Sequence, residues 1–197
     1  MKKVIVTIAR EYGSGGRKIG SLLAQKLGID FYDKEIISLS AKKSGFSEEF
    51  IRANDERHRV SFLYDLYFHT YSPNVFDQAA SAVSCVIKDI ADKGSCVIVG
   101  RAADGILRKY ENCVNVFIHA PIEYRAERVT SEYGVEASNV TKYIEKVDRE
   151  RAAFYNFNSD GKWGDSRNYH LCVNSSVGIE ETAQAIAEYV RQYMKED

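Results

Sequence analysis

Proline and tryptophan are scarce in this chain, and no apolar run is long enough to cross a membrane. The 197 residues include two prolines and one tryptophan. A membrane-spanning helix needs about 20 consecutive apolar residues, so the sequence predicts no membrane partner. The segment Met1–Ala9 is too short for a secretory signal and leads directly into a glycine cluster. We therefore expect a cytoplasmic protein.

An excess of basic residues is also missing. Lysine and arginine number 27 against 28 aspartates and glutamates, which gives a net charge of −1. Proteins that bind nucleic acid usually carry a basic surplus, so we expect no nucleic-acid partner, although a local basic pocket for a small anion stays open. Hydrophobic residues make up 45% of the chain, a globular balance that fits one domain over residues 1–197.

Cysteine pairs and metal-binding spacings are absent as well. The chain has four cysteines but no CxxC pair, and its four histidines are scattered. We interpret the cysteines as buried free thiols rather than as disulfides or metal ligands. The sequence assigns no metal ligands.

Short β-branched runs alternate with helical patterns along the chain. Residues Val4–Ala9 read as a fully buried strand that ends at glycines, and Lys18–Leu27 has apolar residues at helical spacing before Gly28. A last helix follows the apolar face that begins at Ile179. Further strands are expected at Ile29–Tyr32, Cys96–Val99, Cys113–His119 and Tyr169–Asn174. Such alternation predicts a mostly parallel α/β sheet covered on both faces, with ligands beyond the carboxyl ends of the strands.

Two stretches contain no strand pattern. Lys34–Lys93 is helical and polar-aromatic with a break expected at Pro73, and Ile122–Arg167 is rich in charge and ends in a loop over Asn156–Arg167. Both are interpreted as helical insertions over the sheet edge, where substrate flaps would lie.

Three glycines within four residues follow the first strand. The segment reads Arg10-Glu11-Tyr12-Gly13-Ser14-Gly15-Gly16-Arg17-Lys18. Glycines let backbone N–H groups approach an anion, and the helix that follows adds its positive dipole end. A phosphate site is favoured over an ordinary tight turn.

The complete P-loop pattern G-x-x-x-x-G-K-[ST] is nevertheless absent. One register places Gly16 where the lysine belongs, and a shift by one places Arg17 there and Lys18 at the hydroxyl that normally binds Mg²⁺. Arginine supplies charge to phosphates, but neither arginine nor lysine ligates a metal. Ser14 is the nearest hydroxyl.

Several charged residues follow other expected strands. Arg101 comes directly after Cys96–Val99, at a helix start where a cation is unfavourable unless an anion is present. Asp33 ends the second strand, where a helix cap and a ligand role are equally consistent. Asp148 and Arg151 lie on the apolar stripe of a helix, so they either pair with each other or face a ligand.

Taken in order, these segments resemble the cytidylate kinase-like family, a branch of the P-loop nucleoside monophosphate kinases. The matching segments run almost end to end. They are VTIAREYGSGGRKIG at Val6–Gly20, LGIDFYDKEII at 27–37, VIVGRAADGIL at 97–107, VFIHAPIEYRAERV at 116–129, VDRERAAFY at 147–155, and WGD, NYHLCVNSS and GIEE toward the C-terminus.

The resemblance implies a three-layer P-loop NTPase-type sheet with a helical NMP-binding insertion at about 33–93 and a lid at about 124–164. It implies ATP and Mg²⁺ as cofactors and nucleotides as small-molecule partners. Arg101 would touch the acceptor phosphate, with Asp33 near the acceptor. Asp148, taken from its place on the helical stripe, is also predicted to bind the substrate. The roles in phosphate binding and transfer would fall to Gly13, Ser14, Gly15, Gly16, Arg17 and Lys18 in the loop and to Arg128, Arg149 and Arg151 in the lid.

The predicted function is ATP-dependent phosphoryl transfer to a nucleoside monophosphate such as CMP or dCMP. The altered loop leaves two alternatives open, a kinase of another small acceptor and a non-catalytic module that binds nucleotide or phosphate. The sequence does not determine the oligomeric state.

Overall fold

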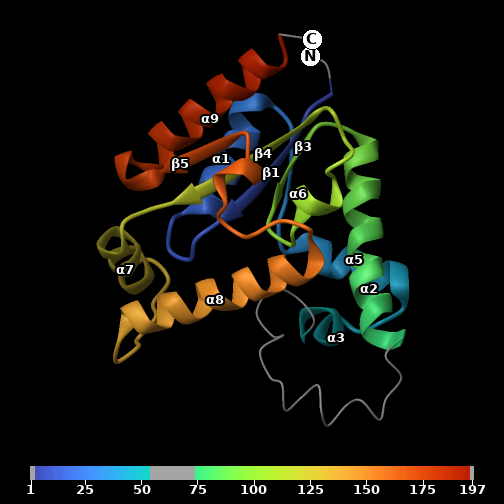
Figure 1. Cartoon of the computed structure of the whole chain (residues 1–197), viewed down its shortest axis with the longest axis horizontal. Helices are drawn as coiled ribbons and strands as arrows, with labels where there is room; N and C mark the ends of the chain where they lie inside the picture. The colour runs from blue at the N-terminus through green and yellow to red at the C-terminus, as the bar shows by residue number, and fades with distance from the viewer. Residues whose placement is uncertain (1–2, 54–73, 196–197) are drawn as a thin grey trace.

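The computed structural model describes residues 3–53 and 74–195 and shows a five-stranded parallel sheet between helices (Figure 1). The strands stand in the order β2-β3-β1-β4-β5. Their bounds are β1 Ile5–Arg10, β2 Asp30–Tyr32, β3 Cys96–Val99, β4 Cys113–His119 and β5 Leu171–Asn174. The predicted α/β sheet with covering helices is confirmed.

Successive residues of β1 face opposite sides of the sheet and build two cores. Val6 and Ile8 pack with α1 (Gly16–Leu27) and α9 (Ile179–Tyr193) on one face. Ile5 packs on the other face with α2 (Glu35–Ser44) and α5 (Asn74–Lys93), next to the short helix α6 (Ala103–Ile106). Because both faces are covered, β1 and β3 are almost entirely buried.

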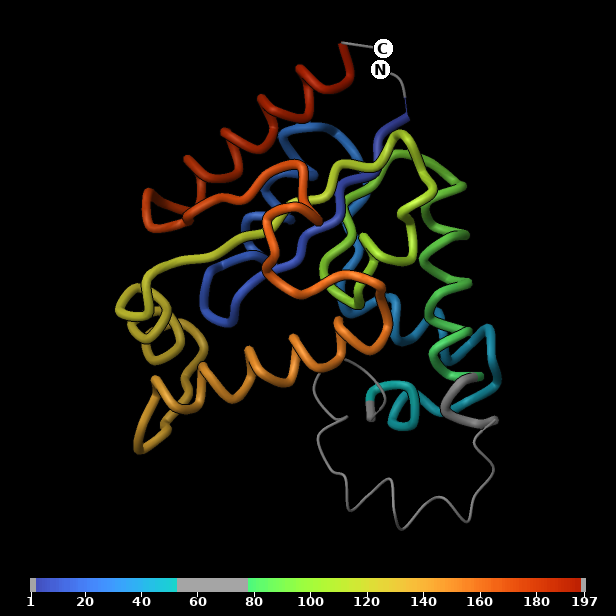
Figure 2. The backbone as a smooth tube through the Cα atoms, viewed as in Figure 1, coloured from blue at the N-terminus to red at the C-terminus, as the bar shows by residue number. Residues whose placement is uncertain are grey.

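Two further helices lie beyond the carboxyl ends of the strands. Helix α7 (Ile122–Ser131) follows β4, and α8 (Val140–Asn158) runs below the sheet edge in Figure 1. They pack on each other through Val129, Ile144 and Val147. Figure 2 shows that the blue loop between β1 and α1 is directed toward these helices. The remaining elements are α3 (Glu48–Ala53) and the 3-10 helices η1 (Ser166–Asn168) and η2 (Ser175–Val177).

Most predicted strand bounds are correct to within two residues. The strands at Cys96–Val99 and Cys113–His119 are confirmed in full. The last strand begins at Leu171 instead of Tyr169, because the Tyr169 amide closes the 3-10 turn onto Ser166. Helix α8 runs to Asn158 and so extends into the loop predicted from Asn156.

Two further expectations concern the stretches in which the sequence predicts no strand. Within the described parts of 33–93 and 124–164, the structure contains helices and no strand. Pro73, the expected break, lies outside the described residues.

The interpretation of all cysteines as buried is wrong for Cys85 and Cys172, which are exposed free thiols. Cys172 faces outward because β5 is an edge strand whose residues alternate between half-buried and exposed. No described helix has both the length and the apolar character needed to cross a membrane.

Candidate phosphate and acceptor site

The loop between β1 and α1 requires glycine for two reasons. Gly13 and Gly15 both have φ of +81°, a left-handed conformation that costs other residues about 1–2 kcal/mol. Space is the second reason, because a Cβ atom on Gly15 would lie 2.3 Å from Cδ1 of Ile179. One on Gly13 would lie 2.8 Å from the carbonyl oxygen of Arg125. The loop is therefore packed tightly on its outer side by α7 and α9.

Side chains from α7, α8 and η2 hold the carbonyl groups of this loop. Four carbonyls, at the last residue of β1 and at three positions of the loop, each accept a hydrogen bond from a side chain more than a hundred positions away in the sequence. The donor and acceptor residues are Arg151 to Arg10 (3.0 Å), Arg125 to Tyr12 (3.3 Å), Arg128 to Gly13 (2.8 Å) and Ser175 to Ser14 (2.7 Å).

The amides of Gly13 and Gly15 lie on the other side of the peptides whose carbonyls belong to Tyr12 and Ser14, whereas the Ser14 amide donates to the Glu11 carbonyl at 3.3 Å. A trans peptide is planar, so its N–H points away from its C=O. Across the described chain, no protein group accepts a hydrogen bond from the amides of Gly13, Gly15, Gly16, Arg17 or Lys18. Together with the positive end of α1, they form a set of donors suited to a phosphate.

The two cations that follow the glycines, Arg17 and Lys18, contact different carboxylates. Arg17 pairs with Asp33 at 2.9 Å, and Lys18 pairs with Glu132 at 2.7 Å. Both side chains are more than half exposed, at 55% and 56%. Each cation therefore ends at a carboxylate on a different side of the loop, and contact of both with one phosphate stays a prediction.

Arg101 occupies a strained and buried position after β3. Gly100, Arg101 and Ala102 have φ of +79°, +58° and +50°, and left-handed backbone at residues other than glycine costs on the order of 1–3 kcal/mol each and often marks a functional site. The Arg101 guanidinium lies 3.8 Å from Asp33, which also pairs with Arg17. Two arginines predicted separately, Arg17 and Arg101, thus converge on the Asp33 carboxylate at the strand ends.

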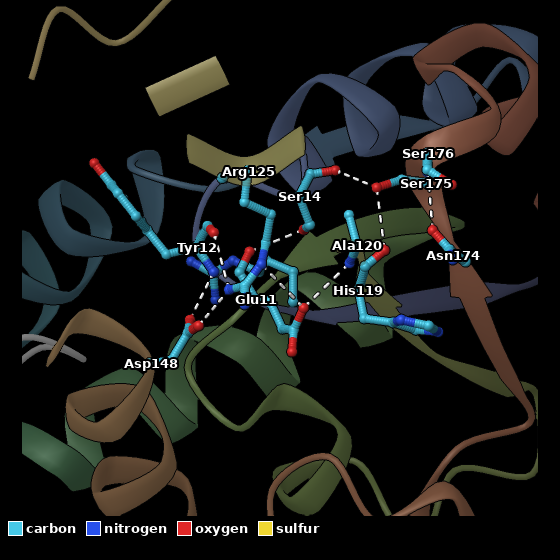
Figure 3. A network of polar contacts seen from close by, with 12 residues as sticks. Glu11, Tyr12, Ser14, His119, Ala120, Arg125, Asp148, Asn174, Ser175 and Ser176 are labelled. Atoms are coloured by element: carbon cyan, nitrogen blue, oxygen red, sulfur yellow. Dashed lines mark hydrogen bonds and ion pairs between the residues drawn. The ribbon is translucent and has the colours of Figure 1, made fainter. Parts of the chain in front are cut away.

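Asp148 contacts α7 and the β1–α1 loop, which its position on the apolar stripe of a helix did not predict. Its Oδ2 pairs with Arg125 at 2.5 Å and its Oδ1 accepts the Tyr12 amide at 2.7 Å (Figure 3). The suggested pair with Arg151 is therefore wrong, because the packing of α7 on α8 places Arg125 opposite Asp148. Arg151 instead reaches the Arg10 carbonyl.

The lid arginines separate into two groups. Arg128 is largely buried and contacts the loop, as does Arg151. Arg149 lies on the outer face of α8, where its side chain is 70% exposed and pairs with Glu145. The structure does not bring Arg149 to the loop, and its catalytic role stays a prediction.

A crevice opens between the ends of β1 and β3 and the inner face of α8. Asp104, which the sequence analysis missed, is 5% exposed and accepts a 2.6 Å hydrogen bond from the Tyr155 hydroxyl. Burial raises the pKa of Asp104 above its ordinary value, although the Tyr155 hydrogen bond opposes this. The sequence signal that could have identified Asp104 is an acidic residue shortly after the buried strand β3. The lining residues are Ala9, Arg10, Gly100, Ala102, Asp104, Arg151, Phe154, Tyr155 and Trp163.

The donor set fits the phosphates of a nucleotide better than it defines a metal site. Backbone amides and arginines are suited to phosphate oxygens. The Ser14 hydroxyl is fully buried and donates to the Glu11 carbonyl at 2.8 Å. In residues 3–53 and 74–195, no group of three or more His, Cys, Asp or Glu side chains is placed to hold a metal ion.

The sequence matches the profile of the cytidylate kinase-like family over residues 5–177. The chain belongs to this family. Comparison with curated proteins gave no significant match. Family and fold together support a nucleotide-dependent kinase, and kinases of the P-loop fold use ATP and Mg²⁺.

Solved structures share the architecture of this cytidylate kinase-like chain. An uncharacterized protein from Eubacterium ventriosum ATCC 27560 is 27% identical, with a TM-score of 0.72 over 96% of this chain and 99% of that chain. A gluconokinase from Sinorhizobium meliloti 1021 is 14% identical, with a TM-score of 0.61 over 98% and 96%. A shikimate kinase from Acinetobacter baumannii in complex with shikimate is 15% identical, with a TM-score of 0.56 over 97% and 94%. The last two similarities show the fold alone.

Proposed function

We propose that this protein transfers a phosphoryl group from ATP to a nucleoside monophosphate such as CMP or dCMP. The observation that carries the proposal is the loop at 13–18. Its Gly13 and Ser14 carbonyls are held by Arg128 and Ser175, and among the described residues no protein group accepts from the amides of Gly13, Gly15, Gly16, Arg17 or Lys18. Phosphoryl transfer depends on positioning and positive charge rather than on a covalent side chain.

The donor phosphates would bind at the amides of Gly13–Lys18, with Arg128 beside the loop. The acceptor phosphate would bind near Arg101, whose strained backbone and buried guanidinium lie at the neighbouring strand end. Asp33 holds both Arg101 and Arg17 there. Mg²⁺ would supply charge neutralisation between the phosphates when bound. Helix α8 covers the strand ends and would exclude water.

A hydroxylated acceptor is the second candidate, and the Asp104 crevice favours it. The Asp104 carboxylate shares this crevice with Arg10 at the end of β1, and a carboxylate there would suit a sugar or sugar-acid hydroxyl as a hydrogen-bond acceptor or a base. The similarity in fold to a shikimate kinase and a gluconokinase supports including such acceptors. A non-catalytic phosphate-binding module is the third alternative, because the P-loop lysine is not matched.

The alternatives separate in a coupled assay of ADP release. CMP, dCMP and the other nucleoside monophosphates are compared with shikimate, gluconate and simple sugars, each with ATP and Mg²⁺. We expect turnover with a pyrimidine monophosphate. Turnover only with a hydroxylated acceptor selects the second candidate, and ATP binding without turnover selects the third.

Replacing Arg101 tests the acceptor site. We expect Arg101→Ala to raise the KM for the acceptor about 10-fold or more, since a charge-assisted bidentate contact contributes about 1.5–3 kcal/mol. ATP affinity should change much less. Steady-state kinetics and ATP titration measure the two effects, and equal losses of both would remove Arg101 from the acceptor site.

A further inference from the structure

One ion pair holds both backbone polar groups of Tyr12. The Tyr12 N–H donates to Asp148 at 2.7 Å, and its carbonyl accepts from Arg125 at 3.3 Å. The two side chains pair with each other at 2.5 Å, from α8 and α7 respectively. Figure 3 shows this closed arrangement of Tyr12, Arg125 and Asp148.

The pair is enclosed and fixed by further contacts. The side chains of Arg125 and Asp148 are 10% and 15% exposed. Arg125 also lies 3.4 Å from the carboxylate of Glu11, which accepts the Ala120 amide at 3.1 Å. Both oxygens of Asp148 accept hydrogen bonds within the protein.

We infer that Asp148 and Arg125 are positioning residues that set the direction of the Gly13 amide in the phosphate loop. The peptide between Tyr12 and Gly13 is planar and trans. Fixing its carbonyl on Arg125 therefore aims the Gly13 N–H to the opposite side. Because Asp148 fixes the preceding peptide as well, the loop cannot rotate at Tyr12 without breaking its hydrogen bonds to the ion pair.

The identity of the ligand in this inference rests on the proposed function. The geometry of the loop does not depend on it. Asp148 is thereby assigned to the donor side of the site, in place of the predicted contact with the substrate. Loss of the pair should weaken phosphate binding through a less ordered loop, because preorganised donors bind with a smaller ordering cost. Outer-shell partners that orient metal ligands contribute about 10-fold to 100-fold to affinity, and we expect the same range here.

The test follows the loop directly in protein labelled with ¹⁵N-glycine. Gly13, Gly15 and Gly16 report on the loop, whereas Gly28 at the far end of α1 and Gly45 at the end of α2 have open space around them and report on the fold. Asp148→Ala removes the pair, and Asp148→Asn keeps an acceptor for Tyr12 without the charge. Lys146→Ala, at an exposed position of the same helix, is the matched control.

In Asp148→Ala, we expect the Gly13 and Gly15 signals to shift or broaden and the Kd for ATP and for pyrophosphate to rise about 10-fold or more. Asp148→Asn should restore part of both effects, and Lys146→Ala should show neither. A purely structural role would not give this graded rescue of the loop signals. If Asp148→Ala fails to fold, the same-sized Asp148→Asn carries the test.

Unchanged Gly13 and Gly15 signals with unchanged Kd in a folded Asp148 variant would overturn the inference. Wild-type protein that binds neither ATP nor pyrophosphate would instead overturn the proposed function, and the glycine signals would still decide the positioning role.

Discussion

Gly15 illustrates at the scale of a single residue why the loop has this composition. Its φ of +81° and its contact with Ile179 exclude a side chain for two independent reasons. Gly45 has a similar φ of +77° but no atom near its missing Cβ. A comparison of alanine substitutions at the two glycines therefore distinguishes the effect of backbone strain from the effect of crowding.

Gly15→Ala should lower the free energy of unfolding by about 2–4 kcal/mol, from left-handed strain and overpacking together. Gly45→Ala should lower it by only about 1 kcal/mol, from strain alone. Urea unfolding of both variants measures the difference, and ATP titration of Gly15→Ala should show weakened binding. Equal destabilisation would mean that Ile179 moves aside without cost.

At the scale of elements, the contact of α6 with α8 includes a buried acid. Asp104 and Tyr155 share a 2.6 Å hydrogen bond, and burial raises the pKa of Asp104 above 3.8. The folded state therefore holds the proton more tightly than the unfolded chain. The stability from this group is present in full below pH 3.8 and is lost as the pH rises through the folded pKa.

Asp104→Asn, which stays uncharged, should gain stability relative to the wild type as the pH rises from acidic toward neutral. Chemical unfolding of both proteins across that range measures the difference in the free energy of unfolding, in which the contributions of other groups largely cancel. Tyr155→Phe removes the hydrogen bond to the carboxylate and should steepen the pH dependence. A constant difference between Asp104→Asn and the wild type would contradict the raised pKa.

The central elements were predictable because their local signals agree with their environment. Continuous β-branched runs such as Cys96–Val99 are what a strand buried on both faces requires. The edge strand β5 was less accurately bounded, since one of its faces is exposed and its pattern is weaker. Helix α8 runs beyond its predicted end and includes Asn156 and Asn158, although asparagine has a low helix propensity.

At the scale of the whole molecule, ligand binding should stabilise the fold. A ligand that binds only the folded state at 100 times its Kd adds about 2.7 kcal/mol, which for a protein of this size corresponds to a rise in Tm of about 5–10 °C. We expect this rise with ATP and with pyrophosphate, measured by thermal unfolding, and a smaller rise with inosine or another nucleoside without phosphates. Equal shifts with the nucleoside would show that the base rather than the loop carries the binding.

The sequence alone determined the parallel sheet, the glycine loop and the family, because these depend on local patterns and on their order along the chain. It also indicated that Asp148 and Arg151 were unlike solvent-facing charges. The tertiary structure decided what these residues contact. Asp148 meets Arg125 and Tyr12 because α7 packs on α8 at the strand ends, and Arg151 meets the Arg10 carbonyl. Such partners are separated by up to 141 positions, and spacing within one helix carries no information about them.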